Sequence, residues 1–400
     1  MTVPTTGLFD ADNHYYEATD AFTRYIEPSM AKRCMQWVEM NGKQRLLVGG
    51  KLNRFIPNPT FDPVARPGSL DEYFRGRNPE AKDIKSAFGA LEPINPGYRD
   101  RDARLKIMDG QGLGGTILFP TLAVGMETSL QHDPEAAIAA FRAFNRWMED
   151  DWGYAYQERI FAAPVITLMD VDAAVAEVER VLALDARVVC IKGGPVFAGD
   201  LSWSPADPRF DPVWARLNEA GVVIGIHSGD AGYGRYLADW EDSRAFEAFR
   251  STPLQTMISS DRVPFDTYAA LLAHGLFDRH RNLRIASIES GSEWVPLLFK
   301  KLKKVYGQNP GAFRRDPMEA FREHVWVAPF YEDDLSGLKD LIGVDHILFG
   351  SDWPHAEGLF DPKSFADDLK RCNYTDDEIA TIMVDNGWAL SKRRVTAGVS

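Results

Sequence analysis

The stretch VVIGIH, residues 222–227, is continuously apolar until it ends in a histidine. A strand with one solvent-exposed face alternates apolar and polar residues, and this run shows no such alternation. The amphipathic stretch DPVWARLNEAG (211–221) precedes it and ends in Gly221, which is typical of a helix C-terminus. Residues 222–227 therefore predict a parallel strand that is covered on both faces and follows a helix.

Seven further apolar runs are separated by amphipathic or turn-rich sequence. They are GLF (7–9), TILF (116–119), APVI (163–166), VVCIK (188–192), RIASIE (284–289), VWVAP (325–329) and HILFG (346–350). Between them, Asp133 and Asp170 stand where helix N-caps are expected. Eight strands that alternate with helices predict an α/β fold, the (β/α)8 or TIM barrel.

Residues 1–400 are expected to form one such barrel domain. The Pro- and Gly-rich residues 18–100 form a long insertion after the first strand, which we expect to serve as a lid or an oligomer contact. Residues 228–283 form a second wide gap, with a helix expected around 264–276. The stretch that follows Thr375 predicts a C-terminal helical extension.

The composition argues against several classes of partner. A formal net charge of −13 disfavours nucleic acids and anionic membrane surfaces. No apolar run approaches the roughly 20 residues of a membrane helix, and the N-terminal residues lack the features of a signal peptide. The three cysteines, Cys34, Cys190 and Cys372, are widely spaced, so we expect a cytoplasmic protein.

Polar side chains follow four of the apolar runs at their carboxyl ends. Asp12 and His14 follow the first run, His227 ends the fifth, Glu289 the sixth, and Asp352 follows the eighth. Barrel enzymes carry their sites at these strand ends. Because clustered carboxylates are costly to bury without positive charge, and carboxylates with imidazoles suit Zn²⁺ or Mn²⁺, the residues predict one divalent metal ion.

DADNHYYE (10–17), the IH that ends at His227, and GSDWPH (350–355) resemble the amidohydrolase superfamily. They are most similar to its amidohydrolase-related branch, which includes aminocarboxymuconate-semialdehyde and gamma-resorcylate decarboxylases. The resemblance implies that Asp12, His14, His227 and Asp352 bind the metal. It also implies a non-oxidative carboxy-lyase that acts on an aromatic or unsaturated carboxylic acid, a small-molecule substrate, and it favours a homodimer.

The chain departs from this branch at the sixth strand, where relatives usually place a histidine and ASIESG offers Glu289. In a carboxy-lyase, Glu289 or His355 would donate a proton to the carbon that loses CO2. A second interpretation is a hydrolase of an amide, lactone or C–C bond, in which metal-bound hydroxide attacks a carbonyl and Asp352 takes its proton. A third is a barrel that only binds a ligand.

Three further residues are substrate-binding candidates. Lys192 and Arg235 carry cations that bind carboxylates, and Trp353 could line an aromatic pocket. Asp10 and Glu17 are expected to orient the histidines or to neutralise nearby cations. Each of these residues also has an ordinary structural alternative. The remaining histidines are expected to be structural: His132, His274, His280, His324 and His346.

Overall fold

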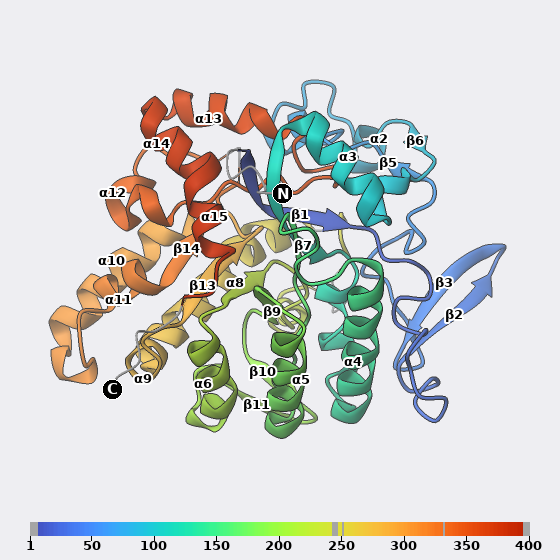
Figure 1. Cartoon of the computed structure of the whole chain (residues 1–400), viewed down its shortest axis with the longest axis horizontal. Coiled ribbons are helices and arrows are strands. Elements are labelled where there is room, and N and C mark those ends of the chain that lie inside the picture. Colours follow the sequence, from blue (N-terminus) through green and yellow to red (C-terminus); the bar gives the residue numbers. More distant parts are fainter. Residues whose placement is uncertain (1–6, 242–246, 250–251, 331–332, 395–400) are drawn as a thin grey trace.

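The computed structural model describes residues 7–241, 247–249, 252–330 and 333–394. Parallel strands form its centre and helices lie around them (Figure 1). The first sheet has the order β1 (Leu8–Tyr15), β7 (Leu113–Pro120), β8 (Ile160–Ala162). The second has the order β14 (Val325–Val327), β13 (Arg284–Ile288), β12 (Val223–His227), β9 (Val188–Lys192). All neighbours pair in parallel, which confirms the α/β prediction.

Backbone hydrogen bonds connect the two sheets. The amide of Cys190 in β9 donates to the carbonyl of Pro164, just after β8, at 2.8 Å. Segment 346–350 lies between β14 and β1 and is joined to each by a backbone hydrogen bond of 2.8 Å. The runs at 163–166 and 346–350, predicted as strands, thus pair with their neighbours only through isolated bridges.

Buried strand residues and capped helices account for this architecture. All five residues of β12 and of β13 are buried, as expected for strands covered on both faces. The carboxylates of Asp133 and Asp170 accept backbone N–H bonds and cap α4 (Pro134–Asp151) and α5 (Val171–Ala183). Helix α6 (Asp211–Ala220) ends at Gly221, whose φ of 58° is left-handed. These predictions are confirmed.

Residues 18–100 contain a three-stranded and a two-stranded antiparallel sheet and several short helices. The hairpin of β2 (Met35–Met40) and β3 (Lys43–Val48) projects away from the helices (Figure 1). The other elements are β4 (Lys51–Leu52), β5 (Val64–Ala65), α1 (Asp71–Phe74), α2 (Ile84–Ala87) and β6 (Leu91–Glu92), before α3 (Arg101–Gln111). A role as lid or oligomer contact stays a prediction.

The helix expected around 264–276 is longer than predicted. Helix α8 (Pro253–Ala273) begins earlier because Thr252 and Gln255 form a capping box. It lies between α7 (Gly234–Leu237) and α9 (Leu276–Arg279). A short hairpin, β10 (Val196–Ala198) with β11 (Leu201–Trp203), follows β9.

The last third of the chain is mostly helical. Its helices are α10 (Trp294–Gln308), α11 (Pro317–His324), α12 (Leu338–Ile342), α13 (Phe365–Arg371), α14 (Asp376–Ala380) and α15 (Asn386–Leu390). A capping box of Thr375 and Glu378 begins α14, as the sequence indicates. No helix among the described residues has the length and apolar character needed to span a membrane.

Candidate metal centre

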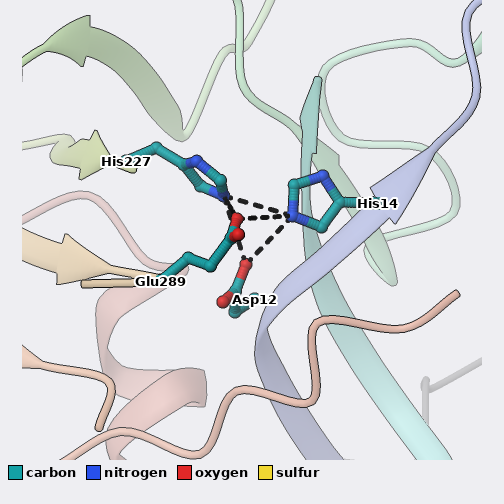
Figure 2. Close-up of side chains that lie close together, drawn as sticks. All are labelled: Asp12, His14, His227 and Glu289. Atoms are coloured by element: carbon teal, nitrogen blue, oxygen red, sulfur yellow. Dashed lines mark hydrogen bonds and ion pairs between the residues drawn. The ribbon is translucent and has the colours of Figure 1, made fainter. Parts of the chain in front are cut away.

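Four side chains from three strand ends meet at one point (Figure 2). Asp12 and His14 lie near the end of β1, His227 ends β12, and Glu289 follows β13. Asp12 and His14 are two residues apart, and both side chains point to the same side of the strand (Figure 2). The carboxyl ends of these parallel strands therefore bring the predicted residues together.

The donor atoms have the spacing of a metal-ligand set. The Nε2 atom of His14 lies 3.1 Å from Nε2 of His227 and 3.4 Å from Oδ1 of Asp12. Oε2 of Glu289 lies 3.1 Å from Nε2 of His227 and 3.5 Å from Nε2 of His14. Four tetrahedral ligands at about 2.0–2.1 Å from an ion are separated by about 3.3 Å. The observed distances match that separation.

Hydrogen bonds also prepare these atoms for a cation. Nδ1 of His227 donates to the carbonyl of Ser228 at 2.7 Å, which leaves the lone pair on Nε2. Oδ1 of Asp12 is buried and has no hydrogen-bond partner among the residues that the structure describes. Asp12, His14, His227 and Glu289 thus form a group that can hold one divalent metal ion, as expected for the cofactor.

The pKa values of the same groups show how strongly they interact. Burial opposes a charged His14, but the nearby carboxylates of Asp12 and Glu289 outweigh burial and raise the pKa of His14 to about 9. Burial would raise the pKa of Asp12, yet the imidazoles of His14 and His227 hold it well below its usual range. The carboxylates therefore stabilise positive charge at this point.

Asp352 lies beside this group and pairs with His355. Its Oδ1 is 3.3 Å from Nε2 of His14 and 2.6 Å from Nδ1 of His355. The ring of His355 lies over that of His14, with centroids 4.0 Å apart. Burial and the nearby Glu289 carboxylate raise the pKa of Asp352, whereas burial and His14 lower that of His355. Asp352 and His355 form a second possible metal-binding group with His14 and Glu289, so Asp352 stays a predicted metal ligand beside the four-donor group.

Two of these carboxylates stand on unusual backbone. Glu289 has a φ of 49° and Asp352 a φ of 55°. This left-handed region costs a residue other than glycine roughly 1–2 kcal/mol. Strained backbone is common at functional sites, and here this conformation directs the side chains of Glu289 and Asp352 towards the same centre.

Asp10 and Glu17 accept hydrogen bonds from the loops next to the centre. Asp10 accepts hydrogen bonds from the Ser351 hydroxyl at 2.5 Å and the Ser351 amide at 3.0 Å. Glu17 accepts from the Leu122 amide at 2.7 Å. Both carboxylates therefore hold the backbone next to Asp352 and around Leu122, while a role in orienting the histidines stays a prediction.

Two of the predicted substrate-binding residues, Lys192 and Arg235, lie against the same aromatic ring, whereas Trp353 packs against Arg104. Nζ of Lys192 donates to the carbonyl of Pro195 at 2.7 Å and lies 5.0 Å from the centre of the Phe197 ring. The guanidinium of Arg235 lies 3.9 Å from the centre of the same ring. A cavity of about 20 Å³ is lined by Lys192 and by His227. Trp353 is only 5% exposed, so its role in substrate binding stays a prediction.

Three residues near the centre were not predicted. Thr121 follows the run 116–119 and contacts His355 through its hydroxyl. Glu357 lies five residues after Asp352, and burial together with the Glu289 carboxylate raises the pKa of Glu357 to about 8. Arg104 is fully buried behind β1. Glu357 shares the stretch 350–358 with Asp352, which was its only signal in the sequence.

The strands and the four donors together define a protein of α/β fold with a metal-binding group at its strand ends. The chain belongs to the amidohydrolase family, whose sequence profile matches residues 93–389. It is 26% identical to gamma-resorcylate decarboxylase of Rhodococcus jostii (strain RHA1) over 289 residues, which cover 68% of this chain and 84% of the relative.

Two solved structures extend the comparison. An amidohydrolase from Mycobacterium avium subsp. paratuberculosis K-10 is 43% identical, with a TM-score of 0.91 over 96% of this chain and 99% of the other. A dihydroxybenzoic acid decarboxylase from Polaromonas sp. JS666, with bound manganese and the inhibitor 2-nitroresorcinol, is 17% identical with a TM-score of 0.58 over 81% and 93% of the chains. The expected family and enzyme class are confirmed, and a decarboxylase is favoured.

Proposed function

We propose that this chain is a metal-dependent decarboxylase of an aromatic or unsaturated carboxylic acid. The observation that carries the proposal is the four-donor group of Asp12, His14, His227 and Glu289. It is supported by the gamma-resorcylate decarboxylase relative and by the manganese of the Polaromonas protein. The backbone bridges between the two sheets support a closed (β/α)8 barrel beneath the site.

The four donors would hold one Zn²⁺ or Mn²⁺ ion, which when bound supplies positive charge to a substrate oxygen. With Glu289 in this group, the pair of Asp352 and His355 is left to carry the proton. The pair gives its proton to the carbon that bears the carboxylate, and a C–H bond forms there. The bond to the carboxylate then breaks, its electron pair stays with the substrate, and CO2 leaves.

Lys192 and Arg235 bind the anionic substrate in this proposal. The guanidinium carbon of Arg235 lies 3.9 Å from the centre of the Phe197 ring, and the group has no hydrogen bond or ion pair with another described residue. A guanidinium presents several N–H groups in a plane that matches a carboxylate. Arg235 is therefore available to bind an anion.

A hydrolase remains the second candidate because Glu289 replaces the histidine that decarboxylase relatives usually have. The same donors serve either reaction, and Asp352 would then accept a proton from the attacking water. A substrate screen distinguishes the two reactions, because a decarboxylase releases CO2 from an acid and a hydrolase cleaves an amide or a lactone.

The metal content of purified protein tests the centre. We expect about one equivalent of Zn or Mn by elemental analysis, a loss of at least tenfold in His227→Ala, and no loss in His132→Ala, which changes an exposed histidine. Little metal in the parent protein would contradict the proposed centre.

The loaded enzyme is then screened with aromatic and muconate-like acids for CO2, and with amides and lactones for hydrolysis. Release of CO2 that depends on the metal supports the decarboxylase. Turnover of amides or lactones alone would replace it with the hydrolase, while the metal centre would stand.

A further inference from the structure

A hydroxyl group lies on the far side of His355 from Asp352. Oγ1 of Thr121 is 2.9 Å from Nε2 of His355 and 2.8 Å from the carbonyl oxygen of Tyr15. A carbonyl oxygen only accepts, so the single hydroxyl proton of Thr121 is directed to Tyr15. Towards His355 the hydroxyl can then act only as an acceptor. Nε2 of His355 must therefore carry a hydrogen.

This fixes the other nitrogen as the one that exchanges a proton. Nδ1 lies 2.6 Å from Oδ1 of Asp352. Nε2 keeps its hydrogen in both the neutral and the charged ring, so only Nδ1 gains or loses one. His355 is 8% exposed, which leaves little room for water to substitute for either partner.

We propose that Thr121 is a positioning residue that sets the tautomer of His355, with the hydrogen on Nε2 and the lone pair of Nδ1 facing Asp352. The catalytic consequence rests on the proposed function, in which the Asp352–His355 pair carries the proton. The tautomer itself is a property of the chain whether or not that reaction is the right one.

The chain offers a matched control for this contact. Thr116 lies in β7, the strand that directly precedes Thr121. It is fully buried, and its hydroxyl donates a hydrogen bond to the carbonyl of Asp10 at 3.0 Å. Thr116→Val therefore removes a buried threonine bond to the β1 backbone and leaves His355 untouched. Thr121→Val removes the same kind of bond together with the acceptor at Nε2, and Thr121→Ser restores the hydroxyl.

Nitrogen NMR of histidine-labelled protein at a pH where the ring is neutral reads the tautomer directly, with the signal assigned by its absence in His355→Gln. We expect the Nε2–H form in the parent, Thr116→Val and Thr121→Ser. In Thr121→Val the ratio of the Nδ1–H tautomer to the Nε2–H tautomer should rise by roughly tenfold or more, because a buried Nε2–H without an acceptor is disfavoured. An unchanged Nε2–H form in Thr121→Val would overturn the proposal, as would an equal change in Thr116→Val.

Activity separates this inference from the proposed reaction. If the enzyme is a decarboxylase, kcat should fall in Thr121→Val with little change in KM and should recover in Thr121→Ser. If the tautomer of His355 changes as expected in Thr121→Val but the protein has no decarboxylase activity, the role of Thr121 stands and the proposed reaction is refuted.

Discussion

At the scale of single residues, Arg104 links three parts of the chain behind the metal centre. Its guanidinium donates to the carbonyl of His14 at 2.7 Å, the carbonyl of Gly97 at 2.7 Å and the side chain of Asn13 at 2.5 Å. The ring of Trp353 covers it, 4.7 Å from the guanidinium carbon. The planar guanidinium group thus fixes the backbone on which His14 lies.

Arg104→Lys should lower the free energy of unfolding by about 2–4 kcal/mol, because one ammonium cannot serve three separated acceptors and leaves buried groups unpaired. Denaturant unfolding measures the change. Arg216→Lys, at a site where the side chain is 45% exposed, should change it by less than about 0.5 kcal/mol. Equal effects in the two variants would show that the three contacts of Arg104 contribute little.

At the scale of elements, the last residue of α11 is a buried histidine. Nδ1 of His324 donates to the carbonyl of Leu283 at 2.7 Å, and its ring stacks on Phe277 at 4.6 Å. Burial lowers the pKa of His324 to about 4. The folded chain therefore holds this ring neutral where the unfolded chain, with a pKa of about 6.5, takes up a proton.

This difference makes stability depend on pH in a defined window. The contribution of His324 is complete above pH 6.5 and is lost as the pH falls towards 4, because the unfolded state then binds the extra proton. It amounts to about 3 kcal/mol. In His324→Asn, which keeps an N–H donor, unfolding experiments at pH 4 to 8 should show a smaller loss. The same pH dependence in both proteins would exclude His324 as its source.

Elements were easier to predict than the contacts between them. The continuous apolar run of β12 and the caps of α4 and α5 are local signals, and each gave its element correctly. Helix α8 begins at Pro253, earlier than predicted, and it continues through Pro264 although a proline inside a helix usually interrupts it. Thr121 and Arg104 matter only through partners far away in the chain, such as His355 for Thr121, so no local pattern could indicate them.

At the scale of the whole molecule, residues 18–100 are tied to the loop that carries His355. The amide of Gly68 donates to the carbonyl of His355 at 3.2 Å, and that of Leu70 donates to Ala356 at 2.8 Å. The ring of Phe61 also stacks on Tyr16, two residues after His14, at 4.5 Å. Residues 18–100 therefore contact the candidate site directly through hydrogen bonds and aromatic packing. That the protein is a homodimer stays a prediction.

Two glycines test this connection. Gly68 has a φ of 70°, and a Cβ there would lie 2.7 Å from the backbone nitrogen of Phe360. Gly76 has a φ of 69° with nothing within 4 Å of its Cβ position. Both alanine variants carry the same conformational cost of about 1 kcal/mol. Gly68→Ala should lose a further 1–3 kcal/mol or so in unfolding experiments, because the clash is with backbone. Equal losses of unfolding free energy in the two variants would show that the backbone at Phe360 can shift to accommodate the added methyl group.

The left-handed backbone of Glu289 and Asp352 has a consequence for how the sequence can drift. Glycine relieves strain at such positions, and asparagine tolerates them, whereas neither can replace the negative charge of a carboxylate. In a laboratory lineage selected for folded protein alone, positions 289 and 352 should be among the first to become Gly or Asn. A lineage selected for catalytic activity should retain both acids and acquire stabilising substitutions at other positions.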